Sequence, residues 1–280
     1  MPQVTTNAGR PRRWRLAALP WLLLAGVVVW NGADRVATDA TTPVVWHGAT
    51  PAETARETLR IATFNIHGGR GGDGRLDLGR TAQQLGEVDL VWLQEVHAGG
   101  WSSRDQADEL GRELGLAAAF LPTERWWWRD HFGNAWLTRQ PLELVQRCPL
   151  PNTRGKAFRQ AVLAEVQLQG QPVRVLGVHV DRQTDRTPQL AIVTRMFLAL
   201  EPPSILVGDL NTSADDPALR PLLEAPGVVD PLQGVTTASG HIDWLLYRGL
   251  DCEAIEYVTG PASDHPAVRA EFRWPRAPAP

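Results

Sequence analysis

Apolar positions along the chain recur in two patterns. Nine runs of continuous or alternating hydrophobic residues predict strands, and three stretches with apolar residues three or four positions apart predict helices. Few helices, unevenly placed among many strands, predict a mixed α/β (α+β) fold with sheet packed on sheet. The expected strands are 60–66, 89–96, 134–138, 161–168, 173–180, 204–208, 242–247, 254–258 and 267–274, and the expected helices are 76–86, 105–116 and 188–200.

A separate apolar stretch lies near the N-terminus. It runs from Leu16 to Trp30, follows four arginines and precedes the first acidic residue, Asp34. This asymmetry is typical of a targeting segment whose N-terminus stays in the cytoplasm. Its 15 residues fall between a cleavable signal core and a spanning helix, with a buried helix as a third interpretation. The best cleavage candidate, 38–40, lies well beyond the run, so we expect an uncleaved anchor.

The chain therefore divides into four parts by pattern. We expect a signal or anchor segment at 1–33, a linker without apolar period at 34–58, one large domain at 59–274 and a loose tail at 275–280. This layout predicts a bacterial inner-membrane protein with a periplasmic domain, or a secreted protein if the N-terminal segment is removed.

Charge and cysteine content limit the function classes. Residues 34–280 carry 24 basic and 31 acidic residues, a net charge of −7. A dedicated high-affinity DNA binder is disfavoured, because such proteins display basic surfaces. Cys148 and Cys252 lack zinc-site spacing, and both one disulfide and two free thiols are compatible with the sequence.

Polar side chains stand at or just past the ends of the expected strands. A single residue of this kind is most often a turn or cap residue, but a whole set at strand ends is typical of a catalytic site held by a sheet. Asp209 and Asn211 are two positions apart, which in an extended chain directs both side chains to one face. The full set is Asn65, Glu95, His179, Asp209, Asn211, Asp243, Asp264 and His265.

The chemistry of this set favours phosphoester hydrolysis. Its carboxylates and amides are hard oxygen ligands, which suit Mg²⁺ or Mn²⁺ and not zinc. Its histidines can transfer a proton near neutral pH, and Asp243 can orient one of them. A divalent cation, a water nucleophile and imidazolium groups together meet the needs of phosphate-ester cleavage.

Two further features are candidates for substrate contact. Trp126, Trp127 and Trp128 stand between arginines, and tryptophan suits both a membrane interface and stacking on bases, although packing within the domain explains some of these rings equally well. Arg182 follows His179 closely and is a candidate for binding phosphate, with an ordinary surface charge as the alternative. The Gly-rich stretch 68–74 lacks the ending of a P-loop.

Seven short motifs follow one another along the chain, and their order is more specific than any one of them. They are 63–67 (TFNIH), 93–95 (LQE), 133–139 (GNAWLTR), 177–179 (GVH), 208–211 (GDLN), 241–243 (HID) and 263–266 (SDHP). The ordered set resembles the endonuclease/exonuclease/phosphatase (DNase I-like) superfamily over essentially all of 59–274. That family includes DNase I-like nucleases, inositol polyphosphate phosphatases and neutral sphingomyelinases. The resemblance implies a four-layer sandwich, two packed β-sheets with helices on the outside.

The resemblance also implies roles for individual residues. The implied metal site is Glu95, the principal Mg²⁺ ligand, with Asn65 and Asp264 close by, and Mn²⁺ is the expected substitute. The implied catalytic residues are Asp209, which activates water, with Asn211, Asp243, His265 and His179, and the substrate-binding candidates are Asn134, Arg182 and Trp128. The chain departs from DNA-directed members in having its two tyrosines late and no recognisable DNA-binding loops, which argues against abasic-site repair.

The sequence thus predicts an exported, divalent-metal-dependent phosphoesterase, most simply a phosphodiesterase. Its partners would be a nucleic acid or phospholipid substrate and the inner membrane, with no obligate protein partner. The alternatives are a non-catalytic binding module on the same fold and a phosphomonoesterase acting on a small phosphate ester.

Overall fold

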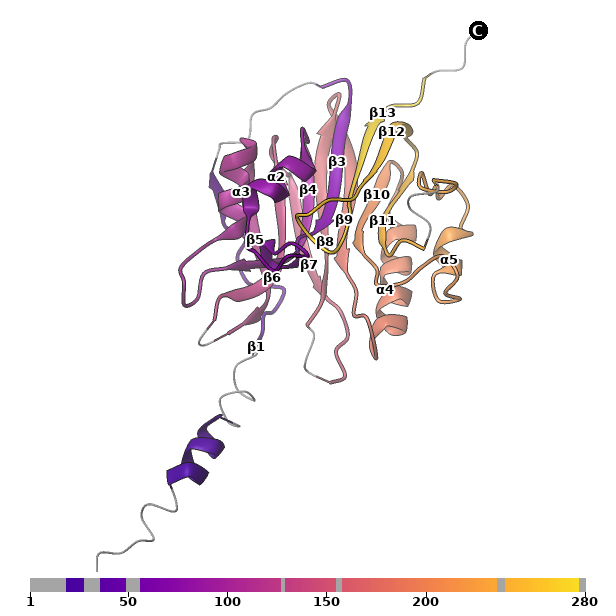
Figure 1. Cartoon of the computed structure of the whole chain (residues 1–280). Helices are drawn as coiled ribbons and strands as arrows, with labels where there is room; N and C mark the ends of the chain where they lie inside the picture. The colour runs from indigo at the N-terminus through magenta and orange to yellow at the C-terminus, as the bar shows by residue number, and fades with distance from the viewer. Residues whose placement is uncertain are drawn as a thin grey trace, which may run out of the picture.

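The computed structural model describes residues 19–27, 36–48, 56–126, 129–154, 158–235 and 240–276. Two β-sheets pack face to face and carry helices on their outer faces, which confirms the expected sandwich (Figure 1). The first sheet has the order β1 (Val36–Ala37), β5 (Ala117–Arg125), β6 (His131–Thr138), β4 (Leu90–Ala98), β3 (Leu59–Asn65), β13 (Ala267–Arg273) and β12 (Asp251–Val258), and β2 (Trp46–Gly48) also pairs with β5. The second has the order β11 (Asp243–Arg248), β10 (Ser204–Asp209), β9 (Gln171–His179), β8 (Gln160–Leu168) and β7 (Leu144–Pro149).

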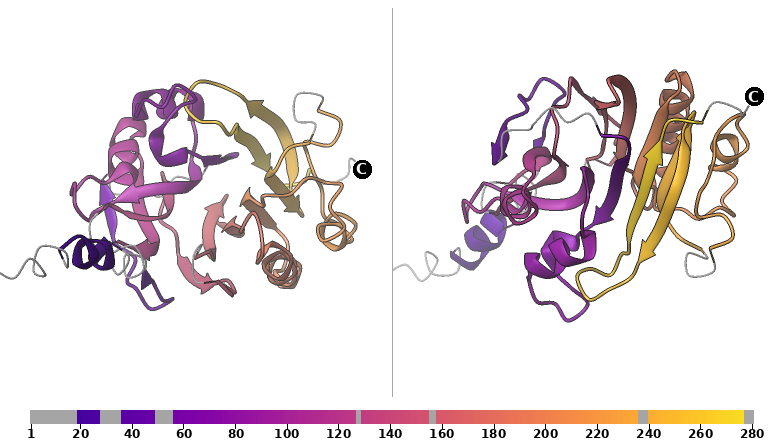
Figure 2. Two further views of the ribbon diagram at one scale, coloured as in Figure 1. Left: turned by 60° about the horizontal axis from the view of Figure 1, so that its bottom comes forward. Right: turned by 90° about the horizontal axis from the view of Figure 1, so that it is seen from above.

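Helices close both outer faces of the sandwich. Apolar residues of α2 (Leu78–Leu85) and α3 (Gln106–Leu114) pack on the first sheet, whereas α4 (Arg186–Ala199) and α5 (Arg220–Leu223) pack on the second (Figure 2). The carboxylate of Asp105 accepts a hydrogen bond from the Asp108 amide at 3.0 Å, and this cap explains why α3 begins there. The helix expected from 188 begins two residues earlier, at Arg186.

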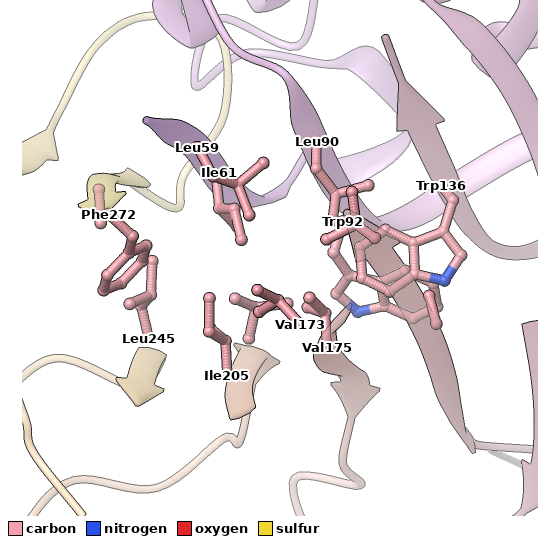
Figure 3. Packing of buried hydrophobic residues seen from close by; sticks show 14 of the residues in the cluster. Leu59, Ile61, Leu90, Trp92, Trp136, Val173, Val175, Ile205, Leu245 and Phe272 are labelled. Carbon is pink, nitrogen blue, oxygen red and sulfur yellow. The ribbon is translucent and has the colours of Figure 1, made fainter. Parts of the chain in front are cut away.

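The two sheets are joined by an apolar core. Side chains such as Ile61, Trp92 and Trp136 from the first sheet meet Val175 and Ile205 from the second (Figure 3). The rings of Trp92 and Trp136 lie 4.6 Å apart, and the Trp92 indole donates to the Val178 carbonyl across the seam at 2.9 Å. Burial of these large side chains therefore fixes the sheets relative to each other.

The segment interpreted as a linker contributes two strands to the first sheet. β1 and β2 both pair with β5. Beneath them the buried guanidinium of Arg147 donates to the carbonyl of Thr42, the hydroxyl of Thr38 and the carbonyl of Pro122. Residues 36–48 are thus attached to the edge of the domain.

The sequence patterns did not predict every strand, and β5 is one that they missed. β5 begins with Ala117, Ala118 and Ala119, which favour helix, and contains Pro122, which cannot donate to a ladder; pairing with β6 overrides both preferences. Cys148 and Cys252 are both free. Within the described ranges, which include helical residues at 19–27, we find no helix of the length and apolarity needed to cross a bilayer.

The strand that carries Asp209 depends on a glycine. Gly208 has φ +144°, and a Cβ there would collide with the carbonyl oxygen of Val178 on the neighbouring strand. We expect Gly208→Ala to lower the free energy of unfolding by about 2 kcal/mol or more, measured by urea denaturation. Gly72→Ala is the control, because a Cβ at Gly72 meets nothing within 4 Å, and it should change stability by less than about 0.5 kcal/mol. Equal effects at both positions would contradict the steric explanation.

Candidate active site

Strand directions bring the predicted polar residues to one edge of the sandwich. β3 runs parallel to β4, and β9 runs parallel to β10, so Asn65, His179 and Asp209 end their strands at one edge; Asn65 pairs with Gln94, which places Glu95 of β4 at the same edge. β11 is antiparallel to β10 and therefore begins at the same edge, where Asp243 pairs with Asp209. β13 likewise begins there because it is antiparallel to β3, and the residues before it reach the same place.

Side chains from the two sheets meet across the seam. Asn65 of the first sheet donates from Nδ2 to Oδ2 of Asp209 in the second at 3.0 Å. His265, which precedes β13 of the first sheet, lies with Nδ1 2.9 Å from Oδ2 of Asp243 in the second. The Ser263 hydroxyl donates to the Asn65 carbonyl at 2.7 Å and holds the His265 loop against β3. The site is therefore assembled only when both sheets are in place.

Local backbone irregularities determine the side-chain directions of Glu95 and Asn211. Glu95 has φ 57° and lies where the pairing of β4 with β6 slips between Leu93 and Val96. Such a bulge rotates one side chain out of the regular alternation of the strand. Asn211 also has a left-handed φ of 50°; its amide N–H donates to Asp209 Oδ1 at 2.8 Å and its Nδ2 to the Val180 carbonyl at 2.9 Å. Conformations of this kind cluster at functional sites.

These residues surround a cavity of about 460 Å³ at the seam. A second cavity of about 520 Å³ adjoins it and shares His67 and Glu95 with it, so the two form one depression. The first is lined by His67, Glu95, Glu124, Phe132, Arg159, His179, Asp181, Arg182, Gln183, Asp209, Asn211, Asp264 and His265.

Burial and neighbouring charge separate the titration of the two histidines. Burial lowers the pKa of His265, but its hydrogen bond to Asp243 and the charge of that carboxylate outweigh burial and raise the pKa to about 9. Burial holds the pKa of His179 well below its usual range, helped by the charges of Arg159 and His265. His265 is therefore a cation at neutral pH and His179 a neutral imidazole.

Asp209 is the carboxylate best suited to accept a proton here. Burial, and then the charge of Asp243, raise the pKa of Asp209 to about 7, against the opposing effects of His265 and Asn65. A carboxylate that titrates near the working pH is an effective general base. The oxygen of Asp209 that accepts from Asn65 also lies 3.7 Å from His179 Nε2, at the floor of the cavity.

Most, but not all, of the predicted residues come together. Asn65 and Asp243 do not line the cavity, but each is hydrogen-bonded to a residue that does. Asn134, predicted to bind substrate, is buried within β6 and is not brought to the cavity lining. Trp128 and Trp127 lie outside the described residues, while Trp126 is half-buried and donates from its indole to Glu124 at 2.9 Å.

Arg159 is the principal residue of the cavity that sequence reasoning missed. It immediately precedes β8, which runs antiparallel to β9, so its position falls beside His179 at the end of β9. Burial lowers the pKa of Arg159, whereas Glu95, Asp209, Glu124 and Asp181 oppose that effect. The signal was available in principle, because the start of an antiparallel strand shares an edge with the end of its neighbour.

The residues present fit a hard divalent cation on the Glu95 side of the cavity. Glu95 and Asp264 offer carboxylate oxygens there, and Asn65 Oδ1, which accepts from the His67 amide at 3.1 Å, keeps a second lone pair. Asp209, Asp243 and His265 also bring ligand atoms within 4.8 Å of one another. That set suits a cation less well, because His265 is itself positively charged and a ligand must be deprotonated.

Comparison with known proteins gives a consistent picture. A model of the Endonuclease/Exonuclease/phosphatase family matches residues 62–265. Among solved structures, an endonuclease/exonuclease/phosphatase from Beutenbergia cavernae is 26% identical, with a TM-score of 0.64 over 80% of this chain and 74% of that one. D. rerio TDP2 complexed with single strand DNA product (17%, TM-score 0.60, 78% and 100% covered) and the human Nocturnin catalytic domain with bound sulfate (16%, 0.60, 83% and 98%) share the fold. No curated protein sequence matches the chain.

The charge of His265 should depend on Asp243. We expect Asp243→Asn to move the pKa of His265 from about 9 toward 6.5, because the neutral amide no longer stabilises the imidazolium. NMR titration of the imidazole signals in metal-free protein measures this directly. Asp251→Asn, on β12, removes a carboxylate elsewhere and should leave that titration unchanged. An unaltered His265 pKa in Asp243→Asn would show that another group holds its charge.

Proposed function

Because the chain belongs to the endonuclease/exonuclease/phosphatase family, we propose that it is a Mg²⁺-dependent phosphodiesterase that cleaves a nucleic acid or a phospholipid head group by water attack. Members of the family are typically hydrolases acting on phosphoester bonds and usually use divalent metals. The observation that carries the proposal is the seam itself, where a buried carboxylate poised to accept a proton, Asp209, lies beside an imidazolium, His265, held by Asp243.

Each residue then has a part in the reaction. Asp209 accepts a proton from the attacking water, and the Asn211 amide holds the other oxygen of that carboxylate in place. His265 donates a hydrogen bond to a phosphoryl oxygen, and the neutral His179 donates a second from Nε2, an atom that has no hydrogen-bond partner among the described residues. A divalent cation at Glu95, Asn65 and Asp264 would neutralise phosphoryl charge and stabilise the leaving oxygen.

We also propose that residues 16–30 anchor the protein in the bacterial inner membrane, with the domain in the periplasm. The arginine flank supports this orientation. Cleavage after Ala40 would remove β1 and the Thr38 contacts to the Thr123 carbonyl and Arg147, which supports an uncleaved segment. Mass spectrometry of the mature N-terminus tests this, and a chain that begins at 41 would contradict it.

Glu95 tests the metal-dependent reaction. We expect hydrolysis of bis-p-nitrophenyl phosphate with Mg²⁺ or Mn²⁺, lost on chelation, and a fall of about 100-fold or more in kcat for Glu95→Gln. Direct titration with Mn²⁺ should show weaker binding in that variant. Glu253→Gln, on β12, is the control and should behave as the unchanged protein. No hydrolysis with either cation would favour the non-catalytic module, and faster hydrolysis of p-nitrophenyl phosphate would favour the phosphomonoesterase.

Substitutions of the half-buried Arg159 and the exposed Arg182 compare two contributions to phosphate binding. Arg159 is held within the seam among carboxylates, whereas Arg182 is exposed on the loop after β9. We expect Arg159→Met to lower kcat/KM about 100-fold and Arg182→Met to lower it less than about fivefold, because water screens an exposed charge. Steady-state kinetics on the same ester measures both. A larger effect at Arg182 would reverse the assignment.

A further inference from the structure

The end of the molecule that bears the cavities also gathers exposed apolar and cationic side chains. Val36, at the start of β1, is 47% exposed, and Trp101, on the loop after β4, is 73% exposed. Arg125 and Arg129 are exposed on either side of the turn between β5 and β6. We call the surface formed by Val36, Trp101, Trp126, Arg125 and Arg129 the Trp101 rim.

Contacts hold the Trp101 rim against the cavities. Ala37 pairs with Glu124, which lines the catalytic cavity, and Val36 pairs with Arg125. The amide of Ser102 donates to Asp130 at 2.8 Å and ties the Trp101 loop to the β5–β6 turn. Trp101 and Arg129 themselves line the second cavity, which shares Glu95 with the first.

The Trp101 rim is also the place where the chain arrives from the apolar segment. Trp30 ends the apolar run and Val36 begins β1, so six residue steps join them, which can span at most about 20 Å. Residues 36–48, which follow this connection, are fixed in position because hydrogen bonds from Arg147 and pairing with β5 attach them to the domain. If residues 16–30 lie in a bilayer, Val36 must lie near its surface.

We propose that the Trp101 rim rests on the outer surface of the bilayer that holds residues 16–30, so that both cavities open onto the lipid head groups and the scissile phosphodiester belongs to a phospholipid of that membrane. Tryptophan favours the membrane interface, and arginine forms bidentate hydrogen bonds with phosphate groups such as those of lipids. The net charge of −7 on residues 34–280 makes long-range attraction of free nucleic acid weak, whereas a tethered domain needs none. The inference rests on the proposed function for its substrate, but not for its docking surface.

The docking surface can be tested without any reaction. The full-length protein, with Cys148→Ser and Cys252→Ser, is reconstituted into vesicles of phosphatidylethanolamine and phosphatidylglycerol and labelled with a fluorophore at Trp101→Cys. Val229→Cys is the control, since Val229 is 41% exposed and pairs with Tyr247 near the end of β11 remote from Asp243. Spin-labelled lipids should quench the label at 101 at least twofold more than the label at 229. Equal quenching at the two positions would overturn the docking surface.

The substrate is tested by comparing rates on one preparation. We expect the reconstituted protein to hydrolyse the vesicle phospholipid, and Trp101→Glu to lower the ratio of that rate to the bis-p-nitrophenyl phosphate rate at least fivefold, while Val229→Glu leaves the ratio unchanged. Cleavage of plasmid DNA without phospholipid hydrolysis would overturn the lipid assignment and leave the proposed function standing. Loss of all cation-dependent hydrolysis would instead refute the proposed function, while the quenching result would still decide the docking surface.

Discussion

The contact between Asp243 and His265 is the interaction on which the site depends. Asp243 belongs to the second sheet and is 1% exposed, and a carboxylate buried to that extent is costly unless it is paired. Its partner arrives from the first sheet, on the loop that Ser263 holds against β3. Packing of the two sheets therefore creates the pair. Displacing the sheets would separate Asp243 from His265 and leave a buried carboxylate without its partner, which costs free energy.

The same burial explains why neighbouring groups behave differently. Asp209 lies next to Asp243 in the sheet register, so ionising both places two negative charges side by side in a site of low polarity. The imidazolium of His265 offsets part of that cost. His179 is equally buried, and among the described residues its Nε2 has no carboxylate closer than Asp209 at 3.7 Å, so its neutral form is favoured. One seam thus contains a carboxylate with a raised pKa, an imidazolium and a neutral imidazole because each group has a different neighbour.

Much of this arrangement could be predicted from the sequence, because strand ends are local features. Continuous apolar runs located β3, β4, β9 and β10, and the polar residue after each run was visible. The pairing of strands is not local, so Arg159, which stands before a strand and not after one, escaped notice, and Asn134 was placed at the cavity although it lies inside β6. The alanines at the start of β5 favour helix by themselves, so this strand, which pairing with its neighbours stabilises, was not predicted.

β5 connects the cavity with the N-terminal segment of the domain. β5 pairs with β6 along one side and with β1 and β2 along the other, and its last residues reach the 460 Å³ cavity at Glu124. A segment without an apolar period need not fold, yet here the buried Arg147 satisfies carbonyl groups of 36–48 and of β5 together. The charge of Arg147 would be costly to bury without acceptors, and detaching the segment would remove two of them, at Thr38 and Thr42, leaving those of Gln160 and Pro122. The domain therefore holds the approach from its N-terminus in one place, beside the mouth of the site.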